Sequence, residues 1–139
     1  MFALAWEEDD GKATQYRRGR GKHVNPIPSA SRRGPFVVSG AISGTDPETG
    51  KVPDDLDAQC RLMFENVRRV MAAAGGSPDD IVKMTVWITD RSLREIMNRH
   101  WVAMFPDLHS RPARHTLTSR DFTAPMQIQC DLMAVLSEG

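Results

Sequence analysis

The segment HSRPARHT, residues 109–116, brings arginine and histidine side chains together around one proline. Arg114 stands just after Pro112, at the predicted start of a strand, where a stiff backbone aims the side chain. Its planar guanidinium fits a carboxylate in bidentate fashion. The alternative is an arginine in a salt bridge at a sheet edge, which the local sequence alone favours. We expect Arg111 to be the solvated member of the pair.

Two further polar residues are candidates for a site. Ser39 stands at a predicted strand end and offers a hydrogen-bond donor, but it has no evident base and is a poor nucleophile. Asn98 stands in a predicted helix beside the apolar stripe, where asparagine is a mediocre helix former. It is either a satisfied buried amide or a polar contact for a ligand.

The spacing of the histidines and cysteines predicts neither a metal site nor a reactive thiol. The side chains of His100, His109 and His115 form no ligand set at helical or strand offsets, so we expect structural or surface roles and no metal. Cys60 and Cys130 lie in apolar periodic segments and are expected to be small buried hydrophobes. The glycine-rich SGAISG leads into a turn, so it predicts no nucleotide-binding loop.

Periodic patterns predict the elements that position these residues. Residues 35–40, PFVVSG, form a predicted strand, and a helix capped by Asp54 or Asp55 follows and ends at the glycines 75–76. A second helix is predicted over 93–104, stopping before Pro106. Further strands are predicted over residues 82–88, 113–118 and 126–136.

The predicted strand over 82–88 alternates Val82, Met84, Val86 and Ile88 with polar or mixed residues, so we expect one face to pack on a helix. The element order β, α, β, α, β, β predicts an α+β fold with both helices on one face of a single sheet. The opposite face carries Trp87, Gln129 and Asp131 and is too mixed for ordinary solvent exposure. We therefore expect neighbouring copies of the chain to bury it.

The composition fits one globular domain in a chain of 139 residues. Eighteen basic residues balance eighteen acidic ones, so no overall field attracts nucleic acid or an anionic membrane. Neither a signal peptide nor an apolar run that would span a bilayer is recognisable, which predicts a cytoplasmic protein. Residues 1–24 are a polar extension, expected to be mobile unless a partner surface holds it, and the domain covers 25–139.

Several segments in their order carry a resemblance to a known family. These are VVSGAISGTDPETGKV, FENVRRVMAAAGGSPDDIVKMTVWITD, the asparagine of the second helix, RPARHT and the last strand. Over roughly residues 25–136 the chain resembles the RidA/YjgF family of reactive-intermediate deaminases, also called endoribonuclease L-PSP. The resemblance implies a chorismate-mutase-like fold and a homotrimer around a barrel-like centre, with active sites in clefts between subunits.

The resemblance also implies an activity and site residues. Deaminases of the family hydrolyse imines or enamines such as 2-aminoacrylate and 2-iminobutanoate to 2-keto acids and ammonia, without a metal or organic cofactor. The family's arginine that binds the substrate carboxylate falls on Arg114. Its helix asparagine falls on Asn98, and the serine at its strand end falls on Ser39, with Gly40 beside it. The resemblance also implies that the backbone of His115 and Thr116 lines the same cleft.

The sequence departs from the family pattern at two of these positions. A glutamate in the last strand, thought to place or activate the attacking water, is replaced by Gln129. An amide orients water but does not accept its proton near neutral pH. Asp131, two residues after Gln129, points to the same side of the strand and is a candidate to replace the missing glutamate. Ile27 stands where the family has a tyrosine.

Three functions follow from these observations. The first is a deaminase in which Arg114 binds the substrate and Gln129 or Asp131 places water. The second is a non-catalytic trimer that binds or senses small carboxylates. The third, a ribonuclease, is disfavoured by the balanced charge and by the lack of stacking aromatics near basic residues; only the basic segment YRRGRGK supports it.

Overall fold

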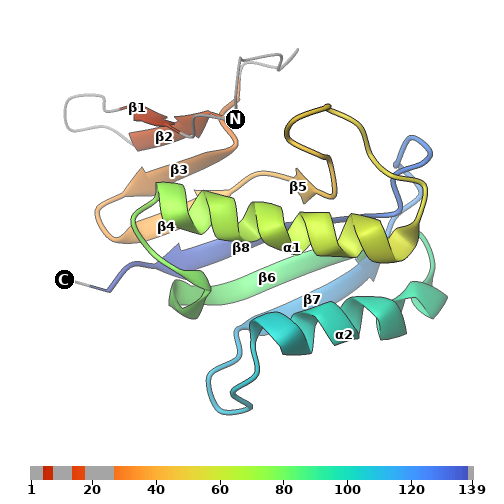
Figure 1. Cartoon of the computed structure of the whole chain (residues 1–139). Coiled ribbons are helices and arrows are strands. Elements are labelled where there is room, and N and C mark those ends of the chain that lie inside the picture. Colours follow the sequence, from red (N-terminus) through yellow and green to blue (C-terminus); the bar gives the residue numbers. More distant parts are fainter. Residues whose placement is uncertain (1–4, 8–13, 18–26, 138–139) are drawn as a thin grey trace.

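The computed structural model describes residues 5–7, 14–17 and 27–137, and within them a single eight-stranded sheet carries helices on one face (Figure 1). The strand order is β1-β2-β3-β4-β8-β6-β7, and β5 pairs with β8. The expected α+β architecture is therefore confirmed. The strands are β1 (Ala5–Glu7), β2 (Thr14–Arg17), β3 (Ala30–Arg33), β4 (Phe36–Ser39), β5 (Ile42–Ser43), β6 (Ile81–Ile88), β7 (Ala113–Thr118) and β8 (Ile128–Val135).

Helix α1 (Leu56–Ala73) begins and ends where local chemistry dictates. The Asp55 side chain accepts a hydrogen bond from the backbone N–H of Ala58 at 3.0 Å, which satisfies a free donor of the first turn. Gly75 has φ of 85°, a conformation that side chains disfavour, and it closes the helix. Of the two caps left open by the sequence, Asp54 and Asp55, the structure has Asp55. The predicted glycine end is confirmed.

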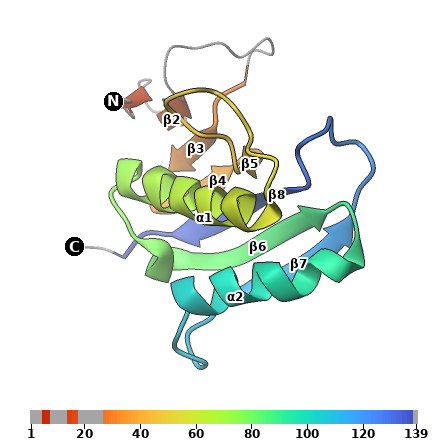
Figure 2. The same cartoon turned by 45° about the vertical axis from the view of Figure 1, so that its right-hand side comes forward.

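Helix α2 (Arg94–Met104) follows the 3-10 turn η2 (Arg91–Leu93) and ends before Pro106, as predicted. Its apolar stripe packs beside α1 over the sheet, and both helices cover the same face in two views (Figures 1 and 2). The hydrophobic core lies between this helical layer and the sheet. Its fully buried large side chains include Met63, Met71, Met84, Met97, Ile128 and Leu132.

The expected inward position of Val82 is wrong. Val82 is 49% exposed, whereas Ile81 is buried. The register between β6 and β8 shifts between Ile81 and Lys83, so this irregularity turns Val82 outward while Met84 stays in the core. From Met84 to Ile88 the predicted alternation is confirmed.

The strands β1, β2, β3 and β5 were not predicted. They are short, and β3 has the sequence ASRR, which lacks the β-branched and aromatic residues typical of strands. Residues 30–33 form a strand because they pair with β4: Ala30 aligns with Ser39 and Arg33 aligns with Phe36. Most of the predicted extension, residues 1–24, lies outside the described residues. Its described parts are β1 and β2, which pair with each other, and β2 also pairs with β3.

Gly44 explains part of the glycine-rich segment SGAISG. A Cβ at this position would overlap the backbone of Gln59, so the loop after β5 touches α1 closely. The fully buried Gln59 donates to the carbonyls of Pro53 and Pro125, both at 2.7 Å. It accepts from the N–H of Gln127 at 2.9 Å. The amide of Gln59 therefore joins α1 to the loops that flank β5 and β8.

No helix in the described part of the chain is long and apolar enough to cross a membrane.

Candidate functional site

Arg114 lies on the edge strand β7 and projects toward the helices. It pairs in register with the buried Met84 of β6, so both side chains share the helix-covered face. Its Nη1 lies 3.3 Å from the Sδ of Met97, and its Cζ lies 4.8 Å from the ring centroid of Trp101. The guanidinium is thus held against α2 by a sulfur contact and a cation–π contact.

Among the described residues, Arg114 has no carboxylate partner. The local sequence alone favoured a salt bridge for Arg114. No such salt bridge is present among the described residues. Burial lowers the pKa of Arg114, and the positive charge of Arg94 lowers it further, although the side chain stays protonated at neutral pH. An anion beside a partly desolvated cation stabilises it, and no described residue supplies one to Arg114.

Asn98 and Thr116 lie on the same side of the sheet as Arg114. Thr116 follows two residues later on β7, in register with the buried Val86. Asn98 is half-buried on α2, next to Met97, and its amide makes no hydrogen bond to any described residue. Of the two alternatives for Asn98, the satisfied buried amide is not observed.

Ser39 and Gly40 lie at the end of β4, some distance from Arg114. The Ser39 hydroxyl donates to the carbonyl of Gly40 at 2.8 Å and accepts from the N–H of Leu132 at 2.9 Å. Leu132 pairs with Met84, which pairs with Arg114, so three strand spacings of ~4.8 Å each separate Ser39 from Arg114. Both hydroxyl functions of Ser39 are already engaged within this chain.

Gly40 contacts the segment that carries Ile27. Its N–H donates to the carbonyl of Ser29 at 2.9 Å, and a Cβ on Gly40 would lie 3.9 Å from the carbonyl oxygen of Pro28. Ile27 is 52% exposed. An apolar side chain is therefore presented beside the end of β4.

Gln129, Asp131 and His115 occupy the opposite, open face of the sheet. Asp131 and His115 both pair in register with Thr85, and Gln129 pairs with Trp87. The indole Nε1 of Trp87 donates to Asp131 at 3.4 Å. Asp131 and Gln129 thus point to the same side, as the alternation predicts, but to the side away from the Arg114 guanidinium.

One chain therefore brings Arg114, Thr116 and Asn98 together on one face and keeps Ser39, Gly40 and Gln129 apart from them. The described residues contain no group of three or more histidine, cysteine or acidic side chains that could hold a metal ion. Burial raises the pKa of Cys60 to about 12, so its thiol stays protonated and is a weak nucleophile.

Two arginines differ from what the sequence predicts: Arg111 is not the solvated residue expected, and Arg94 was not predicted. Arg111 is half-buried, and its Nε donates to the carbonyl of Phe105 at 2.8 Å, so it fastens the loop before β7 and is not simply solvated. Arg94 lies on α2, and its charge affects Arg114. The sequence did hold a signal for Arg94. It lies four residues before Asn98 and seven before Trp101, and residues at these spacings share one side of a helix.

Comparison with known proteins decides the family. The family model described as Endoribonuclease L-PSP matches residues 25–136. The chain belongs to the RidA/YjgF family. It is 30% identical to the 2-iminobutanoate/2-iminopropanoate deaminase of Salmonella typhimurium over 113 residues, which cover 81% of this chain and 88% of that protein.

Solved structures of RidA/YjgF proteins share the fold. The crystal structure of Escherichia coli TdcF with bound serine superposes with a TM-score of 0.75 at 30% identity, covering 82% of this chain and 91% of that one. RidA from the Antarctic bacterium Psychrobacter sp. PAMC 21119 gives a TM-score of 0.75 at 28% identity, covering 81% and 90%. The chorismate-mutase-like fold is thus confirmed.

Proposed function

We propose that this RidA/YjgF protein hydrolyses small imine or enamine carboxylates of the 2-aminoacrylate or 2-iminobutanoate type. The observation that carries the proposal is the partly buried Arg114 guanidinium, which lacks a counterion among the described residues. The deaminase name of the Salmonella relative at 30% identity supports it. The product is a 2-keto acid, with ammonia released.

In the proposed reaction Arg114 binds the substrate carboxylate through two parallel hydrogen bonds. An enamine first becomes the imine by gaining a proton at its Cβ carbon and losing one from nitrogen. Water then adds to the imine carbon, and one of its protons passes to the nitrogen. The remaining hydroxyl proton also passes to the nitrogen as the C–N bond breaks, so ammonia leaves and the carbonyl of the keto acid forms. Gln129 would place the water through its carbonyl oxygen, and Asp131 is the acidic group that follows on the same face. These steps call for no metal or organic cofactor.

We further propose that a homotrimer completes the site. About 14 Å of sheet separates Ser39 from Arg114 within one chain, and Gln129 projects from the opposite face. A molecule of four carbon atoms does not reach all three from within one chain. Residues of a second copy, brought to the edge strand β7, would complete the set. Free, buried cysteines fit a reducing compartment, so we place the protein in the cytoplasm.

The test is ammonia release from 2-iminobutanoate generated in situ by an amino-acid oxidase or dehydratase. We expect the wild-type protein to accelerate ammonia release and Arg114→Ala to lose about 100-fold in kcat/KM. Arg120→Ala is the matched control, since Arg120 is exposed in the loop after β7. Equal rates with wild-type protein, with Arg114→Ala and without protein would overturn the deaminase proposal.

A second candidate function, binding of small carboxylates without turnover, is favoured by the amide of Gln129 in place of an acid. Binding of 2-oxobutyrate that depends on Arg114, together with no ammonia release, would establish this function instead. Endoribonuclease activity has less support, because Trp101 is buried under Arg114 and offers no face for stacking a base.

A further inference from the structure

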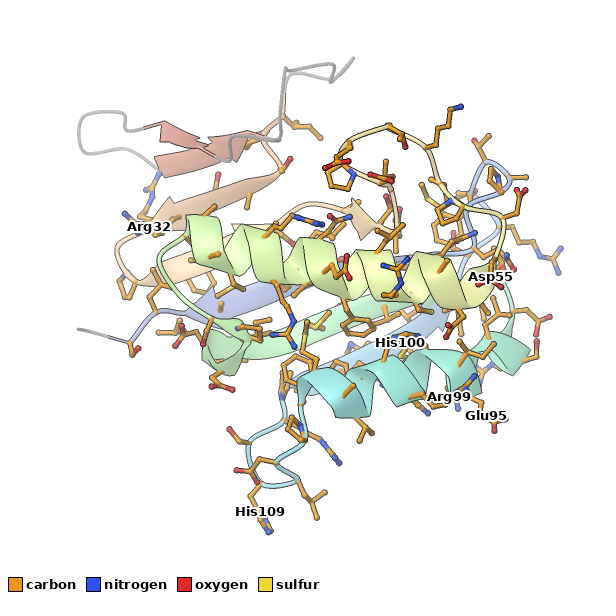
Figure 3. The ribbon with its side chains drawn as sticks, in the orientation of Figure 1. Arg32, Asp55, Glu95, Arg99, His100 and His109 are labelled. Atoms are coloured by element: carbon orange, nitrogen blue, oxygen red, sulfur yellow. The ribbon has the colours of Figure 1, made fainter. Side chains whose placement is uncertain are left out.

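An open groove runs along one flank of α2 and is lined by residues of η2 and α2 alone. Its volume is about 730 Å³, and its walls include Arg91, Arg94, Glu95, Asn98 and Arg99. Arg99 and Glu95 project from the outer side of the helix (Figure 3). The walls thus carry three arginines against one glutamate.

Arg94, Asn98 and Trp101 follow the helical spacing of four and seven residues, so they lie along one side of α2. Trp101 is the residue over which the Arg114 guanidinium lies. The opposite side of the helix faces α1, and His100 lies there between the two helices (Figure 3). Its Nε2 lies 2.7 Å from the Oδ1 of Asp57 on α1. Arg94 is therefore on the Arg114 side, between the edge strand and the groove.

Arg94 has an unsatisfied donor. Its Nε is buried without a hydrogen-bond partner, and no carboxylate in the described ranges forms an ion pair with Arg94 or Arg114. Glu95, its chain neighbour, is exposed and likewise forms no ion pair there. An unpaired buried donor costs free energy. The mutual repulsion of two neighbouring guanidinium groups adds to that cost unless an anion lies between them.

We propose that Arg94 is a specificity-determining residue that binds a second carboxylate of the substrate. The inference rests on the proposed function, in which Arg114 binds the 2-carboxylate. The preferred substrates are then 2-imino or 2-enamino acids whose side chain ends in a carboxylate. Asn98, whose amide is unengaged, lies on the same side of α2 and contacts the part of the substrate between the two carboxylates.

The test compares binding of two product analogues by titration calorimetry at low salt: 2-oxobutyrate, with one carboxylate, and 2-oxoglutarate, with two. We expect wild-type protein to bind 2-oxoglutarate at least about tenfold more tightly, the gain of one charge-assisted contact. In Arg94→Met, which keeps an unbranched apolar stem, the preference should fall below about twofold, because 2-oxoglutarate loses far more affinity than 2-oxobutyrate. Arg68→Met, on exposed α1 surface, controls for net charge.

Three results would overturn the proposal. The first is that wild-type protein shows no preference for 2-oxoglutarate. The second is that Arg94→Met lowers the affinity for both ligands equally, which indicates that Arg94 only supports Arg114. The third is that Arg94→Met changes the oligomeric mass in light scattering, which assigns Arg94 to a contact with a neighbouring copy. Thermal melting of each variant verifies that it is folded.

Failure of this inference is distinguishable from failure of the proposed function. If Arg94 confers dicarboxylate preference but no imine is hydrolysed, the deaminase proposal falls and the second carboxylate position stands. If 2-iminobutanoate is hydrolysed in an Arg114-dependent manner without any dicarboxylate preference, the deaminase stands and the assignment of Arg94 falls.

Discussion

The two faces of the sheet carry different parts of the proposed chemistry and are built differently. On the helix-covered face, Arg114 is held by Met97 and Trp101, so the position of the cation is set within one chain. On the open face, Gln129 and Asp131 lie beside Trp87, and both helices of the described part of the chain cover the other face (Figures 1 and 2). In the proposed mechanism, the fold of one chain positions the cation that binds the anion, whereas the water would be placed on a face that a partner copy completes.

The largest effect is expected from removing the cation. Arg114→Ala should weaken binding of 2-oxobutyrate about 100-fold, because the ligand carboxylate then meets no charge-assisted donor. Arg114→Lys should recover only part of the loss, since an ammonium does not form the bidentate pair. Calorimetric titration measures both. If Arg114→Ala binds 2-oxobutyrate as tightly as the wild-type protein, the ligand binds elsewhere. The assignment of anion binding to the helix-covered face then falls.

A smaller effect is expected from restoring an acid on the open face. Gln129→Glu should raise kcat for 2-iminobutanoate at neutral pH by at least about tenfold, because a carboxylate accepts the proton of water whereas an amide does not. Binding of 2-oxobutyrate should stay within about twofold, since Arg114 is untouched.

Gln127→Glu controls for the Gln129 substitution, because it adds the same charge two residues away in the chain. An equal gain in Gln127→Glu, or no gain in Gln129→Glu, would show that water is not placed from position 129.

The smallest effect concerns the far side of α2, where Asp57 pairs with His100. The hydrogen bond from His100 lowers the pKa of Asp57 from its ordinary 3.8. A carboxyl whose pKa is lower in the folded state stabilises the fold above the unfolded pKa and loses this contribution as the pH falls through the folded pKa. The advantage in Tm of wild-type protein over Asp57→Asn should therefore shrink below pH 3.8.

Ligand binding tests whether the two sides of α2 are independent. Asp57→Asn should bind 2-oxobutyrate like the wild-type protein at neutral pH, because the Asp57–His100 pair lies on the α1 side. A loss of affinity comparable to that in Arg114→Ala would mean that this pair also positions Arg114.

The elements with strong local signals were predictable from the sequence. Asp55 and Gly75 mark the ends of α1 by chemistry that acts within a turn, and β7 matches the predicted 113–118. Strands such as β3 were not predictable, because a neighbour imposes them. The outward turn of Val82 comes from a register shift against β8, which only the paired strands define.

The candidate site was predictable in part. Arg114 and Asn98 emerged from residue type, position and family resemblance. The placement of Arg114 against Trp101, and the influence of Arg94, depend on how α2 crosses the edge strand, which no local pattern encodes. For the same reason, the separation of Gln129 from Arg114 onto opposite faces becomes visible only when the register of β6, β7 and β8 is known.

The most direct test of the role of Arg114 is a crystal structure of the protein with 2-oxobutyrate. We expect both carboxylate oxygens of the ligand to lie within ~3 Å of the Arg114 guanidinium nitrogens, in the bidentate arrangement. A ligand whose carboxylate lies away from Arg114, or a protein carboxylate from a neighbouring copy paired with Arg114 in its place, would contradict it.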